Sequence, residues 1–454
     1  MDRNQIYDSR LDLVNAVNAR AKGLITAVLD GGSFCELDTF MYGDTLYGGA
    51  VGEGVVSGFG RVNDRKVYIY SQNIEVHKGG VSAAHATKII KCMNTASREN
   101  APLISIIDTM GARLEDGLEM LDKYSELLST AATLDVPHIC VIKSAGYGMI
   151  SAFTELADFV IMHENAVTAS TSPMIIDQSS NPAGVGGAVT HSTVTGLCDL
   201  VYKTDAELAK YISQIVNILY ADGSVDSDPN TVAAVLNGKP DAKQILDKVF
   251  DSGALVLREK FEPSVITALA AIADVSCGVI ITDSKISDTL SGKALRKISE
   301  FIVKCDFLDL PAVIFLDSKG LKSSLIEEHG GIVKEYAALL RRLNNAETKI
   351  VTVITGAAVG AAYAALASNK NGISDILAWV TAQVSALPSA AAANILYAEE
   401  ISKAADKDAA VKQLASQYEN ESADVYYAAK HGYIDNIIEP ALTRQYLYLL
   451  LREE

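Results

Sequence analysis

Two glycine turns are the residues of this sequence best suited to chemistry. Gly148-Met149 and Gly360-Ala361-Ala362 each follow an apolar segment and precede a stretch rich in small residues. Glycine lets a ligand approach the main chain closely, and the first N–H groups of a helix have no partner within it. The helix dipole adds partial positive charge there. Each turn can therefore form an oxyanion hole, although a tight strand-to-helix junction would use the same small residues.

Other kinds of catalytic site are not indicated. The sequence contains no HExxH motif, no Gly-x-Ser-x-Gly elbow and no phosphate loop ending in Gly-Lys-Ser/Thr. Asp108 and Asp317 end apolar segments, where an aspartate usually caps the next turn. His85 and Tyr363 have groups that transfer protons, but we expect both to be packed or hydrogen-bonded. The pattern favours stabilisation of developing negative charge by the main chain, with no metal site.

The two turns belong to a sequence that repeats itself. Five segments recur in the same order and at a nearly constant separation along the chain. The pairs are 28–32 with 249–253, 67–72 with 279–283, 102–108 with 311–317, 138–143 with 350–355, and Gly148 with Gly360. An amphipathic helix is expected after the second segment of each half. We interpret the chain as two tandem copies of one α/β unit, which makes a purely structural role for both turns less attractive.

The elements that position the turns are predicted to be buried strands. Continuous apolar strands that alternate with helices are typical of strands covered on both faces, in a layered β-α-β fold. Residues 221–243 are rich in Gly, Pro, Asp and Asn and resemble a linker, so we divide the chain into halves 1–222 and 223–454. Residues 48–60 precede a predicted turn at Asn63-Asp64 and indicate a hairpin. Gly52-Glu53-Gly54 within them is not followed by a helix pattern, which argues against dinucleotide binding.

Composition narrows the function further. A formal net charge of −17 argues against nucleic-acid binding, which needs clustered Lys and Arg. The six cysteines are scattered, so we expect reduced, mostly buried thiols. No apolar run is long enough to span a membrane, and residues 1–5 have no apolar signal core. We therefore expect a cytoplasmic protein.

At these residues the chain resembles the carboxyltransferase subunits of biotin-dependent acyl-CoA carboxylases and decarboxylases, such as the β chain of propionyl-CoA carboxylase. The similarity covers nearly the whole length and rests on an ordered set of motifs. In the first half these are Ser71-Gln72, His85-Ala-x-Lys88-Ile89, Asp108-x-x-Gly111-Ala112-Arg113 and His191-x-Thr193-x-Thr195-Gly196. In the second half they are Glu328-x-Gly330-Gly331-Ile332, Gly360-x-Ala362-Tyr363, Ala378-Trp379-x-Thr381-Ala382-Gln383, Asn394-Ile395-Leu396-Tyr397, Gly432-Tyr433-Ile434-Asp435 and Thr443-Arg444.

The resemblance implies a duplicated crotonase-like (ClpP/crotonase) ββα spiral that forms a hexamer built from dimers. The active site would lie between the first half of one subunit, which binds acyl-CoA, and the second half of its partner, which binds biotin. The roles it implies are assigned by position. Gly148 and Met149 would hold the thioester oxygen, Ala361 and Ala362 after Gly360 would hold the ureido oxygen of biotin, Gly111, Ala112 and Arg113 would contact CoA, and Tyr363 and Ala364 would line the substrate site.

The family reaction needs no side-chain base. In it, carboxybiotin releases CO2, the biotin enolate removes the α-proton of the thioester, and the thioester enolate captures CO2. The chain has no Met-Lys-Met biotinylation motif and no ATP-grasp glycine loop. We therefore expect it to need a separate biotin carboxyl carrier protein, together with a biotin carboxylase or a membrane decarboxylase subunit.

The sequence departs from the family at the substrate site. Met110 and Met149 stand where the family usually has glycine, and Leu387-Pro388-Ser389 replaces a Met-Gly stretch. Ala364 replaces a residue that often influences acyl choice. Three alternatives therefore remain beside the carboxylase component: the decarboxylating component of a sodium pump, a non-catalytic scaffold of the assembly, and a crotonase-type hydratase or hydrolase that acts without biotin.

Overall fold

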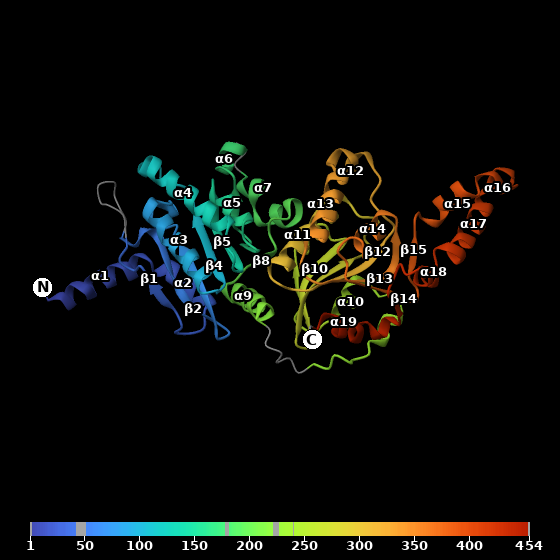
Figure 1. Ribbon diagram of the computed structural model, residues 1–454. Coiled ribbons are helices and arrows are strands. Elements are labelled where there is room, and N and C mark those ends of the chain that lie inside the picture. Colours follow the sequence, from blue (N-terminus) through green and yellow to red (C-terminus); the bar gives the residue numbers. More distant parts are fainter. Residues whose placement is uncertain (1, 42–50, 178–180, 221–226, 239, 453–454) are drawn as a thin grey trace. The chain divides into compact units, whose positions relative to one another are not determined.

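A computed structural model describes residues 2–41, 51–177, 181–220, 227–238 and 240–452 of the chain. The chain divides into two compact units, the first ending at Asn217 and the second beginning at Ile218. In Figure 1, each unit is a sheet with helices packed on it. The predicted hairpin residues 48–50 and linker residues 221–226 lie outside the described residues.

The first unit contains a sheet and a series of α-helices among its described residues. Its strands are β1 (Cys35–Leu37), β2 (Val55–Val62), β3 (Arg65–Gln72), β4 (Leu103–Thr109), β5 (His138–Tyr147), β6 (Phe159–His163), β7 (Val167–Ala169) and β8 (Leu200–Tyr202). Its helices are α1 (Arg3–Val17), α2 (Ala19–Val28), α3 (Ala83–Arg98), α4 (Gly117–Ala132), α5 (Ile150–Glu155), α6 (Pro173–Ile176), α7 (Pro182–Gly186), α8 (Ala188–Thr190) and α9 (Asp205–Leu219).

The second unit repeats the order of the strands and has several helices between its last two strands. Its strands are β9 (Leu255–Leu257), β10 (Val265–Ile272), β11 (Val275–Thr282), β12 (Ala312–Ser318), β13 (Ile350–Val359), β14 (Asp375–Trp379), β15 (Gln383–Ser385) and β16 (Asn436–Ile438). Its helices are α10 (Ala242–Val249), α11 (Gly292–Phe307), α12 (Leu325–Gly330), α13 (Ile332–Asn345), α14 (Ala361–Leu366), α15 (Ser389–Leu396), α16 (Ala398–Lys403), α17 (Lys407–Ser422), α18 (Val425–Lys430) and α19 (Thr443–Leu451).

The two sheets have the same topology, which confirms the predicted duplication. In the first, the strand order is β1-β2-β3-β4-β5-β6-β8, with β7 paired to β5. In the second, it is β9-β10-β11-β12-β13-β14-β16, with β15 paired to β13. The first three strands of each sheet are antiparallel and the remaining pairs are parallel. The Gly52–Gly54 segment enters strand β2, as the hairpin interpretation predicted.

The register of the strands corrects one predicted match by a single position. In the first hairpin Val55 pairs with Gln72, and in the second Val265 pairs with Thr282. The counterpart of Gln72 is therefore Thr282, and the predicted match to Asp283 was wrong. The apolar pattern could not resolve this shift, because Thr282 and Asp283 are both polar. The hydrogen bonds do resolve it: the side chain of Gln72 accepts from the Asp108 N–H, as Thr282 does from the Asp317 N–H.

The central strands are buried along their length, as predicted for strands covered on both faces. Every residue of β4 is buried, and β12 is buried except for partial exposure at Asp317. Helix α3 packs against α4 and α11 against α13. Five of the six cysteines are buried and Cys35 is exposed, close to the prediction. Within the described ranges, no helix combines the length and apolar character required to cross a bilayer.

Buried lysines at matching positions connect a helix to the hairpin in each unit. Lys88 of α3 donates from Nζ to the Val55 carbonyl at 2.8 Å, and burial lowers its pKa to about 8. Lys297 of α11 donates from Nζ to the carbonyls of Val265, Phe261 and Arg258 at 2.6, 2.7 and 3.0 Å. Because buried carbonyls need donors, each ammonium group fixes the entry into the hairpin.

Replacing Lys297 with methionine should destabilise the second unit. The substitution keeps the volume of the side chain but leaves several buried carbonyls without their donor, so we expect a loss of roughly 2–4 kcal/mol in the free energy of unfolding. Urea denaturation followed by fluorescence reports this unit, because the only tryptophan, Trp379, lies in it. The exposed Lys293 of the same helix gives the control Lys293→Met, which should change stability by less than about 0.5 kcal/mol. Equal stabilities for both variants would contradict the role given to Lys297.

Candidate active site

The first predicted turn joins β5 to α5 through a glycine in the left-handed region. Gly148 has φ +77° and donates its own N–H to the Ala169 carbonyl of β7 at 3.0 Å. Its amide is therefore used by the sheet. Among the described backbone groups, no carbonyl accepts from the N–H of the next residue, Met149, which precedes helix α5. The Met149 amide is thus the first donor available to a ligand at this turn.

The second predicted turn has the same construction. Gly360 has φ +54° and donates its N–H to the Ser385 carbonyl of β15 at 2.9 Å. Ala361 and Ala362 then begin helix α14, and no described backbone carbonyl accepts from either amide. Ala361 is partly exposed whereas Ala362 is fully buried. The Ala361 amide is therefore the better placed of the two to meet a ligand.

A further glycine turn lies beside the first one. After β4, Gly111 has φ +117°, donates its N–H to the Thr109 hydroxyl at 3.0 Å and accepts at its carbonyl from the Val81 N–H at 2.9 Å. A Cβ at Gly111 would lie 3.2 Å from the Tyr147 carbonyl oxygen, so the two turns are adjacent. No described backbone carbonyl accepts from the Ala112 amide. Ala112 and Met149 therefore present two available amides on neighbouring turns.

The second unit repeats this neighbouring turn after β12. Gly320 has φ +118°, and a Cβ there would lie 3.6 Å from the Val359 carbonyl oxygen. Leu321 occupies the position that matches Ala112, and no described backbone carbonyl accepts from its amide. In the sequence, these two glycine turns follow the matched segments 102–108 and 311–317. The sequence pattern does not indicate how close each of them lies to the turn after the next strand.

The side chain of Arg113 is buried and forms an ion pair. Its Nη1 lies 3.0 Å from Oε2 of Glu53, and the two side chains are 7% and 0% exposed. Ser82 donates its hydroxyl to the same Glu53 oxygen at 2.8 Å. Arg113 was expected to contact CoA, but its guanidinium points at Glu53. A CoA contact at Gly111, Ala112 and Arg113 would therefore fall to the main chain.

His85 belongs to a buried hydrogen-bond chain, as its expected packed role required. Its Nδ1 faces the Glu53 carbonyl at 2.9 Å, and this ring nitrogen must donate because a carbonyl only accepts. Its Nε2 then accepts from the Gln72 side-chain amide at 3.1 Å. Burial lowers the pKa of His85 to about 3, so the ring is neutral near pH 7. Sequence reasoning missed Glu53, which is the centre of this chain.

The remaining predicted residues surround the second turn. Tyr363 is partly buried and donates its hydroxyl to the Tyr433 carbonyl at 3.2 Å, which matches the hydrogen-bonded role expected for it. The Ala364 N–H donates to the Gly360 carbonyl at 2.9 Å inside helix α14. Leu387 is exposed beside α15, and Met110 is exposed in the first unit.

The side chain of Met149, one of the expected departures from the family, packs against the core of the first unit. Its backbone has φ −57°, which suits any L-residue. The methionine therefore leaves the amide in place, and its side chain lies on the core side of the turn.

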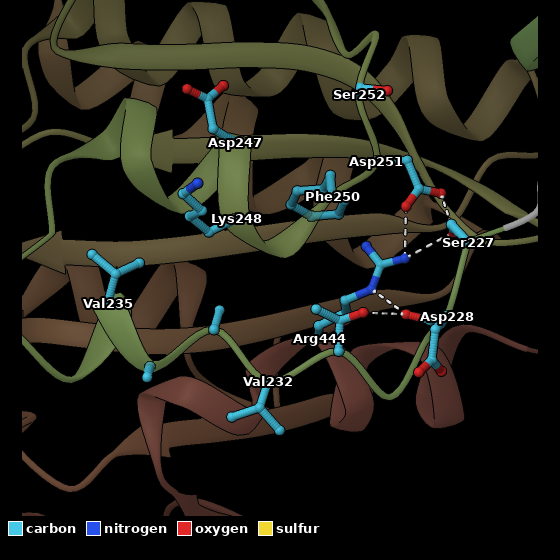
Figure 2. A pocket seen from close by; sticks show the side chains of 13 residues that line it. Ser227, Asp228, Val232, Val235, Asp247, Lys248, Phe250, Asp251, Ser252 and Arg444 are labelled. Atoms are coloured by element: carbon cyan, nitrogen blue, oxygen red, sulfur yellow. Dashed lines mark hydrogen bonds and ion pairs between the residues drawn. The ribbon is translucent and has the colours of Figure 1, made fainter.

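A separate hollow of about 620 Å³ lies in the second unit around Arg444 (Figure 2). Arg444 donates to the Val249 carbonyl at 2.8 Å, to the Ser227 hydroxyl at 3.0 Å and to the Asp251 carboxylate at 2.6 Å. None of the turn residues lines it. Because its guanidinium is occupied by the protein itself, Arg444 connects Ser227 and Asp228 of the predicted linker to the core.

Replacing Arg113 should show how much its ion pair with Glu53 contributes to the free energy of unfolding. Arg113→Met leaves a buried carboxylate without its cation, so we expect a loss of roughly 3–5 kcal/mol in the free energy of unfolding. The double variant Glu53→Gln/Arg113→Met removes both charges and should recover at least half of that loss. Urea denaturation followed by circular dichroism measures both. A double variant as unstable as Arg113→Met would show that the ion pair is not what Arg113 contributes.

Comparison with known proteins shows the family. The carboxyl transferase domain matches residues 21–453. The carboxyltransferase subunit of propionyl-CoA carboxylase from Haloferax mediterranei is 30% identical over 95% of this chain and 89% of its own length. Methylmalonyl-CoA decarboxylase subunit alpha from Propionigenium modestum is 28% identical over 94% of this chain and 88% of its own length.

A solved structure shows the same fold. The hexameric transcarboxylase 12S, with methylmalonyl-CoA bound, superposes with a TM-score of 0.89 at 26% identity, covering 99% of this chain and 95% of that one. This likeness confirms the predicted duplicated crotonase-like fold. Together with the domain match across nearly all of its length, it shows that the chain belongs to the carboxyl transferase family.

Proposed function

We propose that this protein is the carboxyltransferase component of a biotin-dependent enzyme that moves a carboxyl group between carboxybiotin and the α-carbon of a short acyl-CoA. The family and the relatives that act on propionyl-CoA or methylmalonyl-CoA support this proposal. The observation that carries it is the pair of available amides, Met149 and Ala361, at matching turns of the two units. The relatives include carboxylases and a decarboxylase, so both directions of the same transfer fit.

The first unit is proposed to stabilise the thioester. When the α-carbon gains or loses a carboxyl group, negative charge develops on the thioester oxygen. The amides of Ala112 and Met149 lie on adjacent turns and point to no described carbonyl. Two fixed donors aimed at one oxygen stabilise that charge without reorganising, and each is typically worth about 10²–10³ in rate.

The second unit is proposed to hold the biotin of a carrier protein. Its available donors, the amides of Ala361 and Leu321, stand on the matching pair of turns, where they would donate to the ureido oxygen of biotin. Bound carboxybiotin supplies an activated carboxyl group. The Ala361 carbonyl accepts from the Tyr336 hydroxyl at 3.1 Å, which fixes the first peptide of α14.

No side chain at these turns is proposed as the base. His85 is neutral and has both ring nitrogens bonded, and Tyr363 donates to a backbone carbonyl. The main chain therefore does the work of binding, orienting and neutralising charge. The α-proton would therefore pass between the reacting molecules and not to a protein side chain.

The proposed partners follow from what each unit binds. We place the protein in the cytoplasm with a biotin carboxyl carrier protein and either a biotin carboxylase or a membrane decarboxylase subunit. Its dimer-based assembly, proposed as a hexamer like that of transcarboxylase 12S, would bring the thioester turn of one subunit to the biotin turn of another.

The direct test is turnover by the purified full chain. The protein is incubated with malonyl-CoA or methylmalonyl-CoA, with and without free biotin, and the carboxylated thioester is measured by chromatography. We expect the thioester to be lost only when biotin is present. Turnover that is independent of biotin would favour a hydratase or hydrolase. No biotin-dependent turnover across a broad acyl-CoA panel would favour a scaffold without catalysis.

Ala361→Pro tests the second turn. Proline removes one N–H and is tolerated at the first position of a helix, so the fold should survive. We expect turnover to fall by about 10²–10³, with acyl-CoA binding unchanged. Lys407→Pro is the matched control, because Lys407 is the first residue of α17 and exposed. Turnover by Lys407→Pro should stay within about twofold of the wild type. Full turnover by folded Ala361→Pro would instead show that the second turn has only a structural role.

A further inference from the structure

The strand before each catalytic turn changes its neighbour partway along. In the first unit, Ile139–Ile142 of β5 pair with β6, whereas Ala145–Tyr147 pair with β7. In the second, 351–354 of β13 pair with β14, whereas 357–359 pair with β15. The change of neighbour is thus a property of both copies and lies immediately before the turns.

A bulge accompanies the change. On the other side of β5, Ile107 pairs with Ile142 but Thr109 pairs with Gly146. The segment 143–145 of β5 therefore stands opposite the single residue Asp108. The second unit shows the same shift, in which the segment 355–357 of β13 stands opposite Asp317. A bulge leaves amides unpaired and must be stabilised by other groups.

In each unit, the carboxylate of that single residue stabilises the bulge. Asp317 accepts from the Ala357 N–H at 2.7 Å through Oδ1 and from the Ser284 hydroxyl through Oδ2. Asp108 accepts from the Ser144 hydroxyl and from Arg20 Nη2 at 3.1 Å. Burial raises the pKa of Asp108, while Ser144, Arg20 and a hydrogen bond from the Ala145 N–H act to lower it.

The two copies use different donors for the same carboxylate. Ser144 of the first unit corresponds to Gly356 of the second, in the same register that matches Gly148 with Gly360. Ser144 donates to Asp108, whereas at Gly356 any Cβ would collide with the Asp317 carboxylate. The carboxylate in the bulge is thus common to both units although the groups around it differ.

The bulge determines which amides reach the ligand. Successive amides of a strand point to opposite sides, so a shift by a single position would exchange them. With the bulge in place, the Gly148 N–H bonds to β7 and the Met149 N–H is left available. Gly360 and Ala361 stand in the same relation to β15. Losing the carboxylate would free the strand to slip and misplace the available amide.

We propose that Asp108 and Asp317 are positioning residues, which act through the bulge to aim the Met149 and Ala361 amides. This inference rests on the proposed function for its kinetic consequence. Its structural part does not depend on that function: each carboxylate fixes the register of the strand that precedes its turn.

The test compares variants of Asp317 with a matched carboxylate at the opposite end of the strands. Asp317→Ala should lower kcat/KM at least tenfold while the KM for acyl-CoA stays within twofold, because the thioester turn lies in the other unit. Asp317→Asn, which keeps an oxygen for Ala357 and an amide for Ser284, should restore most of the rate. The control is Asp435→Ala: Asp435 accepts from the Ile376 N–H at 2.7 Å at the start of β14.

Hydrogen–deuterium exchange of the full chain separates the two proposals. We expect residues 357–362 to exchange faster in Asp317→Ala and to be unchanged in Asp435→Ala. Wild-type kinetics and exchange in Asp317→Ala would overturn the inference, as would an equal kinetic loss in Asp435→Ala. If the wild-type protein shows no turnover, the proposed function fails, and the exchange comparison alone decides the positioning role. Faster exchange confined to 357–362 would then support it, and unchanged exchange would overturn it.

Discussion

The candidate site depends on one hydrogen bond in each unit, from a glycine N–H to the short strand beside it. Gly148 bonds to Ala169 and Gly360 to Ser385. Because this bond holds the glycine N–H in place, the positive φ of Gly148 and Gly360 then determines where the next amide points. A left-handed glycine then turns the chain into a helix whose first amides have no partner within it. The available donors at Met149 and Ala361 are consequences of this bond.

Duplication gives two such sites with different surroundings. The first unit supports its neighbouring glycine turn with the buried pair Glu53 and Arg113. The second has Pro263 and an exposed Lys322 at the corresponding positions. In the second unit, Lys297 donates hydrogen bonds to several backbone carbonyls near the hairpin, whereas Lys88 of the first unit donates to the Val55 carbonyl. The two units thus share the strand order and the turns, while the interactions that stiffen them differ. This difference suits two turns that are proposed to bind different molecules.

The sequence was sufficient for features that depend on local pattern. Buried strands, the duplication and both turns follow from apolar runs that end in glycine. It was insufficient where a contact joins distant residues of similar polarity. The apolar pattern matches the segment ending at Gln72 with the one ending at Asp283, and only strand pairing shows that Thr282 is the counterpart of Gln72. The burial of Arg113 depends on Glu53, which lies far earlier in the chain and which no periodicity connects to it. The use of the Gly148 amide by β7 is likewise invisible without the sheet.

The departures of this chain from its family become understandable once the donors are main-chain groups. An N–H is present whatever side chain its residue carries, provided that φ stays negative. Met149 meets this condition and packs its side chain on the core, so its amide stays available at the turn. Met110 and Leu387 are exposed instead. Under the proposed function, the main chain would stabilise the charge, and the side chains around it would be free to select the acyl group.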